Sequence, residues 1–221
     1  MKFKYELHCH SNPVSACSRF AVKDMVECYI KNGYNGIVLA NHINPQTFLK
    51  QPTSRWSDLM AYFLSDYEQA KDLAGDKLTV LLGAEVRFYE NNNDYLLYGD
   101  VQDFLMNCPN LMHLGIKKFS DLAREAGLLL FQAHPFRNGM TITNPDLLDG
   151  IELHNGHPRH DSRNDLAALW QKRYDLLYTA GSDAHEEGDI SSGILTDIEI
   201  KNNETLLDVL KSGNFEIIKQ D

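Results

Sequence analysis

The sequence is poor in several features that would fix a class of protein at once. Its 221 residues contain 4 cysteines, Cys9, Cys17, Cys28 and Cys108, and no C-x-x-C pair, so neither a disulfide framework nor a zinc ribbon is expected. No apolar run approaches the roughly 18 residues of a membrane-spanning helix, and the first ten residues carry no apolar signal segment. We therefore expect a cytoplasmic protein with no membrane partner.

Basic residues are also few relative to acidic ones. Lysine and arginine total 21 against 31 aspartate and glutamate residues, which gives a net charge of −10 at pH 7. That balance disfavours long nucleic acid and acidic membrane surfaces as partners, because both are polyanions. It does not exclude one small anion bound at a local positive site.

Linkers, internal repeats and low-complexity tracts are absent as well, so we expect a single domain over residues 1–221. Short apolar runs alternate with amphipathic segments instead. Strands are expected within residues 3–7, 36–40, 78–86, 95–98, 128–133, 151–153, 176–179 and 215–218. Helices are expected within residues 21–30, 56–74, 116–126, 161–173 and 204–211, and a loop within 44–55.

This alternation is typical of an α/β protein with a largely parallel sheet that is buried on both faces. About seven such units in a chain of this length favour a compact barrel of β/α units over an open sheet. In such barrels the chemistry lies at the carboxyl ends of the strands. We therefore expect functional side chains directly after the apolar runs.

Potential metal ligands follow six of the expected strands. They are His8 with His10, His42, Glu85, His134, His154 with Asn155, and Asp183 with His185. The i, i+2 spacing of the first and last pairs places both members on one face of a strand. Imidazole and carboxylate are ligands of zinc, iron and manganese, and buried ionisable groups are costly unless they are paired or metal-bound. The pattern predicts a metal site in which Glu85, with two oxygens to share, bridges ions.

The motifs ELHCHS, ANH, GAEV, AHP and GSDAH, in this order from Glu6 to about Glu199, resemble the polymerase and histidinol phosphatase (PHP) domain. The resemblance implies a distorted seven-stranded (β/α)7 TIM-like barrel. It also implies a metal-dependent phosphoesterase with two or three divalent ions, Zn, Fe or Mn. By matching position, His8, His10, Glu85 and Asp183 would hold the first ion, Glu85 and His134 the second, and His42 and His185 the third.

Three positions depart from the family pattern. Ser15 or Cys17 stands where a further ligand of the third ion is expected. Asn41 stands where many members have aspartate. In the segment that often supplies a histidine to the second ion, Asp94 or Tyr95 takes its place, and Asp94 is added to the predicted metal ligands.

The expected reaction is hydrolysis of a phosphomonoester or small phosphodiester by a metal-activated hydroxide. Asp183 is the candidate to orient that hydroxide, and His185 or another histidine is the candidate to protonate the leaving oxygen. A phosphate also needs fixed cations. The candidates, all in loops after expected strands, are Arg137, His157, Arg159 and Arg163. The expected partner is thus a small phosphorylated substrate; the alternative is a catalytically inactive metal-binding scaffold or regulatory module.

Overall fold

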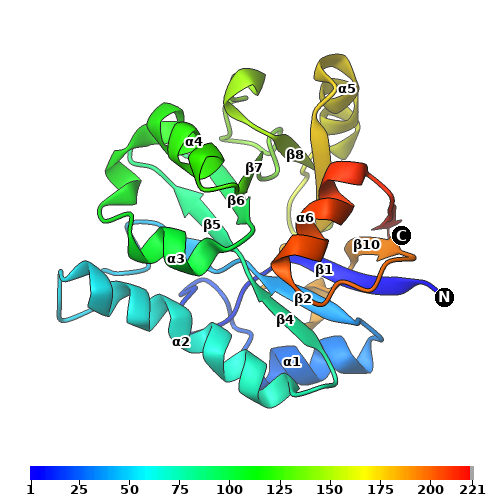
Figure 1. Ribbon diagram of the computed structural model, residues 1–221, viewed down its shortest axis with the longest axis horizontal. Coiled ribbons are helices and arrows are strands. Elements are labelled where there is room, and N and C mark those ends of the chain that lie inside the picture. Colours follow the sequence, from blue (N-terminus) through cyan, green and yellow to red (C-terminus); the bar gives the residue numbers. More distant parts are fainter. Residues whose placement is uncertain (220–221) are drawn as a thin grey trace.

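A computed structural model describes residues 1–219 and shows a mixed α/β fold (Figure 1). The strands are β1 Phe3–Cys9, β2 Gly36–Leu39, β3 His42–Ile43, β4 Thr79–Leu82, β5 Ala84–Arg87, β6 Asp94–Tyr98, β7 Leu129–Gln132, β8 Gly150–Asn155, β9 Leu177–Gly181, β10 Ser192–Thr196 and β11 Glu216–Lys219. The helices are α1 Val22–Lys31, α2 Trp56–Ala74, α3 Val101–Met106, α4 Gly115–Glu125, α5 Asn164–Tyr174 and α6 Asn203–Ser212. No helix within these residues is long and apolar enough to cross a membrane.

The strands form two sheets. One has the order β11-β10-β1-β2-β4, and the other has the order β3-β5-β6-β7-β8-β9. The pairs β5-β6, β6-β7, β1-β10 and β10-β11 are antiparallel, so the sheets are mixed rather than largely parallel. The physical reason is plain at β5 and β6, whose short connection cannot contain the crossover that a parallel pair needs. The α/β class is confirmed, whereas the two sheets do not close over residues 1–219, and the (β/α)7 barrel stays a prediction.

Two strands and one α-helix, namely β3, β10 and α3, were not expected from the sequence, and one expected strand is divided. The apolar run 78–86 breaks at Gly83 into β4 and β5, which belong to different sheets. A Cβ atom at Gly83 would lie 2.6 Å from Val38 Cγ1. Only glycine therefore allows this segment to approach β2 so closely. The break carries the chain from one sheet into the other.

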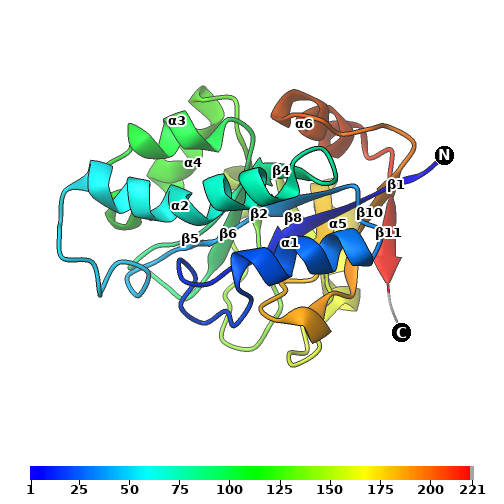
Figure 2. The same ribbon diagram turned by 90° about the horizontal axis from the view of Figure 1, so that it is seen from below.

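The helices cover the sheets through apolar faces that the sequence pattern had indicated. In both views α1 and α2 run along the strands β2 and β4 (Figure 1, Figure 2). Met25 and Tyr29 of α1 and Ala70 of α2 are buried there against Ile37 and Val80 of the sheet. The spacing of such residues along each helix produces this single buried face.

The ends of β1 and β9 meet in a seam that positions the functional residues. Asp183 N donates to His8 O (2.7 Å), and His10 N donates to Ala184 O (3.0 Å). Gly181 makes this approach possible, because a Cβ atom there would collide with His8. The motifs ELHCH and GSDAH, about 170 residues apart, are thereby placed side by side.

Candidate metal centre

Four buried side chains meet at the seam. His8 projects from β1, and His10 follows directly after the end of that strand. Glu85 projects from β5, and Asp183 from the turn after β9. His8 Nε2 lies 3.4 Å from Glu85 Oε1 and 3.5 Å from Asp183 Oδ1. His10 Nε2 lies 3.4 Å from Glu85 Oε2 and 3.2 Å from Asp183 Oδ1. We call these four residues the acidic cluster.

Two polar atoms of the acidic cluster have no hydrogen-bond partner and could bind a cation. His8 Nε2 and Glu85 Oε2 are buried and have no hydrogen-bond partner within the described part of the chain. Burial raises the pKa of Glu85 and Asp183, but the neighbouring histidines outweigh it and hold both pKa values well below the ordinary range. Buried ionised carboxylates beside unpartnered imidazole nitrogens form a donor set that suits zinc, iron or manganese.

A second group of possible ligands shares Glu85. His134 Nε2 lies 3.1 Å from Glu85 Oε1 and 3.9 Å from Asp94 Oδ2. Of the two candidates on β6, the structure brings Asp94 to this group, while the hydroxyl of Tyr95 bonds elsewhere, because successive side chains of a strand point to opposite faces. Arg87 donates to both oxygens of Asp94 (2.7 and 2.5 Å), so any ion there shares this carboxylate with a guanidinium.

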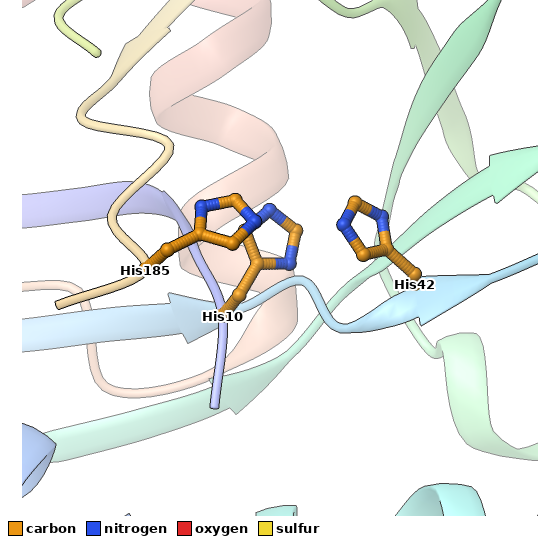
Figure 3. Close-up of side chains that lie close together, drawn as sticks. All are labelled: His10, His42 and His185. Carbon is orange, nitrogen blue, oxygen red and sulfur yellow. The ribbon is translucent and has the colours of Figure 1, made fainter. Parts of the chain in front are cut away.

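A third group consists of three imidazoles, which we call the histidine triad: His10, His42 and His185 (Figure 3). The ring centroids of His42 and His185 lie 4.2 and 4.4 Å from that of His10. His185 Nδ1 donates to the backbone oxygen of Asp183 (2.8 Å), which leaves Nε2 as the nitrogen with a free lone pair. Burial, with the two neighbouring imidazoles, holds the pKa of His10 well below its usual range, so His10 is neutral.

The three departures from the family pattern have different structural meanings. Asn41 Oδ1 accepts a hydrogen bond from Ser15 Oγ (2.8 Å), and Ser15 Oγ accepts one from His42 N (3.0 Å). Asn41 and Ser15 thus brace the histidine triad from behind. Cys17 instead lines the cavity above the triad. Partial burial raises the pKa of its thiol, but hydrogen bonds with His185 and His42 outweigh burial and lower the pKa to about 6.

Glu152, on β8, contacts two of the predicted metal ligands and was not expected from the sequence. Its Oε1 lies 2.8 Å from His8 Nδ1, and its Oε2 accepts hydrogen bonds from His134 N (2.9 Å) and Asn155 Nδ2 (2.9 Å). A carboxylate at Nδ1 fixes the tautomer that presents Nε2 to a metal. The available signal was a glutamate inside the apolar run GIELHN, the same signal that pointed to Glu85.

Glu6 is a second buried carboxyl group behind the acidic cluster. Its Oε1 accepts hydrogen bonds from His8 N and Ser182 N (both 2.9 Å), and its Oε2 accepts one from the Tyr29 hydroxyl (3.2 Å). Burial raises the pKa of Glu6 to about 7. Glu6 therefore ties β1 to the segment after β9 without entering the cavity.

Two residues of the ligand groups adopt a backbone conformation that non-glycine residues rarely take. The φ angle is 29° at His134 and 53° at Asp183. Such residues cost on the order of 1–3 kcal/mol each and collect at functional sites. Here the backbone of His134 is held by Glu152, and that of Asp183 by His8.

A cavity of about 290 Å³ opens above the clusters. It is lined by Cys17, His42, Glu85, Arg87, Asp94, His134, Arg137, His157, Arg159, His160, Asp183 and His185. Three of the eight arginines of the sequence line it, and none of the lysines does within residues 1–219. Arginine is suited to this place, because its planar fork matches phosphate oxygens.

The predicted cationic residues divide into those that reach the cavity and one that does not. Arg137 donates to Asp183 Oδ2 and Asn155 Oδ1 (both 2.8 Å), and its Nε is buried without a partner in the described chain. His157 and Arg159 also line the cavity. Arg163 instead donates to Phe136 O and Asn138, where it pins the loop before α5, and the structure does not bring it to the cavity.

His157, His185 and Asp189 form one more group with metal-like spacing. Both oxygens of Asp189 are already used, because Arg159 donates to them at 2.6 and 2.8 Å and His185 N donates to one at 2.9 Å. The carboxylate of this group is therefore already paired with Arg159, whereas the acidic cluster has unpartnered atoms. Among the other candidates, His154 lies outside the cavity and bonds to Asn164.

Comparisons with known proteins agree with this picture. A family model described as PHP-associated matches residues 161–215. Among proteins with curated descriptions, none matches the sequence. One similar solved structure is a two-domain protein from Bacteroides vulgatus described as containing a PHP-like metal-dependent phosphoesterase, with 16% identity and a TM-score of 0.72. The alignment covers 100% of this chain and 65% of that one.

Two further structures are similar. A protein from Bifidobacterium adolescentis, described as a metal-dependent phosphoesterase, has 14% identity and a TM-score of 0.56, with 95% of this chain and 96% of that chain covered. A lesion-specific endonuclease from Pyrococcus furiosus has 18% identity and a TM-score of 0.64, with 98% and 58% covered. This chain spans less than two thirds of the endonuclease and of the Bacteroides protein.

Proposed function

We propose that this chain, which is a PHP-family protein, is a metal-dependent hydrolase that cleaves a phosphomonoester or a small phosphodiester. One observation carries the proposal. The unpartnered His8 Nε2 and Glu85 Oε2 lie buried beside a cavity whose walls carry arginines. Ligands for a divalent ion and cations for a phosphate thus occur in one place.

The ligand groups of the structure support two or three ions. In the acidic cluster, in the group of Glu85, Asp94 and His134, and in the histidine triad, the ligand atoms lie within 4.8 Å of one another. Each group would hold one divalent ion, and zinc, iron and manganese all suit these donors. When bound, such ions lower the pKa of a water molecule and neutralise charge on the phosphoryl oxygens.

The chain's own residues would then position the reactants. Arg137 has an unpartnered Nε that would donate to a phosphoryl oxygen. Asp183 Oδ2 is held by Arg137 and Asn155, and this carboxylate would accept a hydrogen bond from the attacking water and orient it. His185 would protonate the leaving oxygen. If a metal were bound by His185, then His160, which also lines the cavity, would take that role.

A small substrate suits this site better than long nucleic acid. A cavity of about 290 Å³ holds a phosphate and a modest organic group. The net charge of −10 repels a polyanion at longer range. We propose a small phosphorylated molecule as the partner.

We also propose that the two sheets are parts of the distorted (β/α)7 barrel. β2 continues into β3, and β4 into β5, so two strands pass from one sheet to the other. The bridge between Cys9 and Ala184 links β1 to the end of β9 on the opposite side. Counted this way, the ring is β1, β2, β4, β6, β7, β8 and β9, with β10 and β11 outside it.

The test combines metal analysis with a substrate screen. The purified protein is expected to hold two or three transition-metal equivalents by inductively coupled plasma mass spectrometry. It is expected to hydrolyse members of a panel of phosphomonoesters and small phosphodiesters, and to lose this activity after chelation. Full metal content without hydrolysis of any ester would favour the inactive scaffold, and a protein that binds no metal would exclude both functions.

A further inference from the structure

Arg87 lies beside the ligand group of Glu85, Asp94 and His134, which we call the Asp94 group. Arg87 follows Glu85 by two residues on β5, so both side chains point to the same face of that strand. In the antiparallel pairing of β5 with β6, Arg87 lies directly opposite Asp94. Strand register therefore brings a guanidinium to the place where two carboxylates and an imidazole meet.

The guanidinium of Arg87 engages both oxygens of Asp94. Arg87 Nε donates to Oδ1 at 2.7 Å and Nη2 donates to Oδ2 at 2.5 Å, and the Asp94 side chain is only 4% exposed. Two parallel charged hydrogen bonds make this one of the stronger kinds of side-chain pair. The pair neutralises a buried carboxylate that would otherwise be costly. A metal ion that binds Asp94 must displace the guanidinium or share the carboxylate with it.

His134 is also less well oriented for an ion than two histidines of the other groups. Its Nδ1 is buried and has no hydrogen-bond partner among residues 1–219. By contrast, Nδ1 of His8 lies 2.8 Å from Glu152 Oε1, and Nδ1 of His185 lies 2.8 Å from the backbone oxygen of Asp183. A partner at the second ring nitrogen orients a ligating histidine and increases its basicity. The Asp94 group lacks this support at its imidazole.

We propose that Arg87 competes with a divalent ion for Asp94, so that the Asp94 group binds its ion more weakly than the acidic cluster and the histidine triad bind theirs. The inference rests on the metal centre of the proposed function. The Arg87 side chain is 32% exposed and lines both the main cavity and a neighbouring hollow of about 270 Å³ toward Asn44, so it has space to move away from Asp94. Two ions are then resident, and the third exchanges with the solution.

The test is a zinc titration of metal-free protein, in which chelators set the free zinc concentration and bound zinc is counted per chain. We expect two equivalents to bind at low free zinc and a third only at higher free zinc. Arg87→Gln removes the competitor, so the last equivalent should bind at about tenfold lower free zinc, the scale of one charged hydrogen bond. Arg55→Gln, at an exposed arginine just before α2, is the matched control and should bind zinc as the unmodified chain does.

Two further variants identify the step and guard against misfolding. Asp94→Asn should lose the last equivalent and keep the first two. Arg87→Lys keeps the charge but not the two-pronged contact, and it should give a smaller shift in the same direction. Circular dichroism checks the fold of each variant. If Arg87→Gln tightens all equivalents alike, the effect is the general loss of a positive charge, and the competition is overturned.

Hydrolysis assays on the same samples separate this inference from the proposed function. A last equivalent that does not shift in Arg87→Gln, or three equivalents of equal affinity in the unmodified chain, overturns the competition. If those samples hydrolyse phosphoesters, the proposed function stands. A shifted last equivalent in a protein that hydrolyses no ester supports the competition and overturns the function. A chain that binds no zinc overturns both.

Discussion

The acidic cluster and the histidine triad share His10, yet they are built from different parts of the fold. The acidic cluster is held between strands, and buried carboxylates support His8 from behind. The triad lies nearer to solvent, with the side chains of His42 and His185 each 13% exposed, and a surface loop braces it. Strand register fixes the first group, whereas loop docking fixes the second. Substitutions at His42 or His185 can therefore change the triad without disturbing the acidic cluster.

Glu85→Gln is expected to have the largest effect, because Glu85 belongs to two ligand groups and lies 2.7 Å from His42 of the third. Glutamine keeps the shape but removes the charge that holds the ions together. We expect the loss of at least one metal equivalent and a fall in hydrolysis of more than about 100-fold, measured by mass spectrometry and steady-state kinetics. Glu68→Gln, on the exposed face of α2, is the control and should leave both unchanged. Full metal content in Glu85→Gln would exclude a bridging role.

Glu152→Gln should separate the two groups, because Glu152 contacts His8 but no triad residue. Losing this orienting carboxylate is expected to weaken metal binding at the acidic cluster by about 10- to 100-fold. Metal binding at the histidine triad should remain. Titration with a competing chelator measures the affinity, and Glu125→Gln, exposed at the end of α4, is the matched control. An equal loss at both sites would show that they do not act separately.

Arg137→Lys tests whether Arg137, on the cavity wall, contacts the substrate. Lysine cannot reproduce the fork that bonds Asp183 and Asn155 while leaving Nε free. We expect KM for a phosphoester to rise about tenfold, consistent with one charged hydrogen bond. Arg163→Lys, outside the cavity, should behave as the unmodified chain in the same assay. A larger effect at Arg163 would contradict this placement.

Glu6→Gln is expected to act on stability rather than turnover. Burial raises the pKa of Glu6 from an ordinary 4.5 to about 7, so the folded state binds its proton more tightly than the unfolded state. This contribution is complete below pH 4.5 and is lost as the pH rises through 7, by an amount on the order of 3 kcal/mol. Urea unfolding of metal-free protein at pH 5 and pH 8 should show this loss, and glutamine should remove it. A pH dependence that survives in Glu6→Gln would assign it to the histidines.

Much of the candidate site was predictable from local spacing. The pairs His8/His10 and Asp183/His185 were expected on one strand face each. The structure brings both pairs together, but β1 ends before His10 and β9 ends before Asp183, so strand alternation does not place them. The choice between Asp94 and Tyr95 was open, because the sequence does not show which face of β6 points to the site. Arg137 and Arg163 were equivalent as loop arginines, and only the placement of the loop before α5 separates them.

The sequence by itself determined the kinds of ligand and the alternation of strands and helices, because both depend on residue type and on spacings of a few residues. The tertiary structure alone decided which ligands share an ion and which carboxylates support them. The contact of His8 with Glu152 joins residues 144 positions apart. Such a contact is set by the order and register of strands across the sheets, which no local pattern encodes.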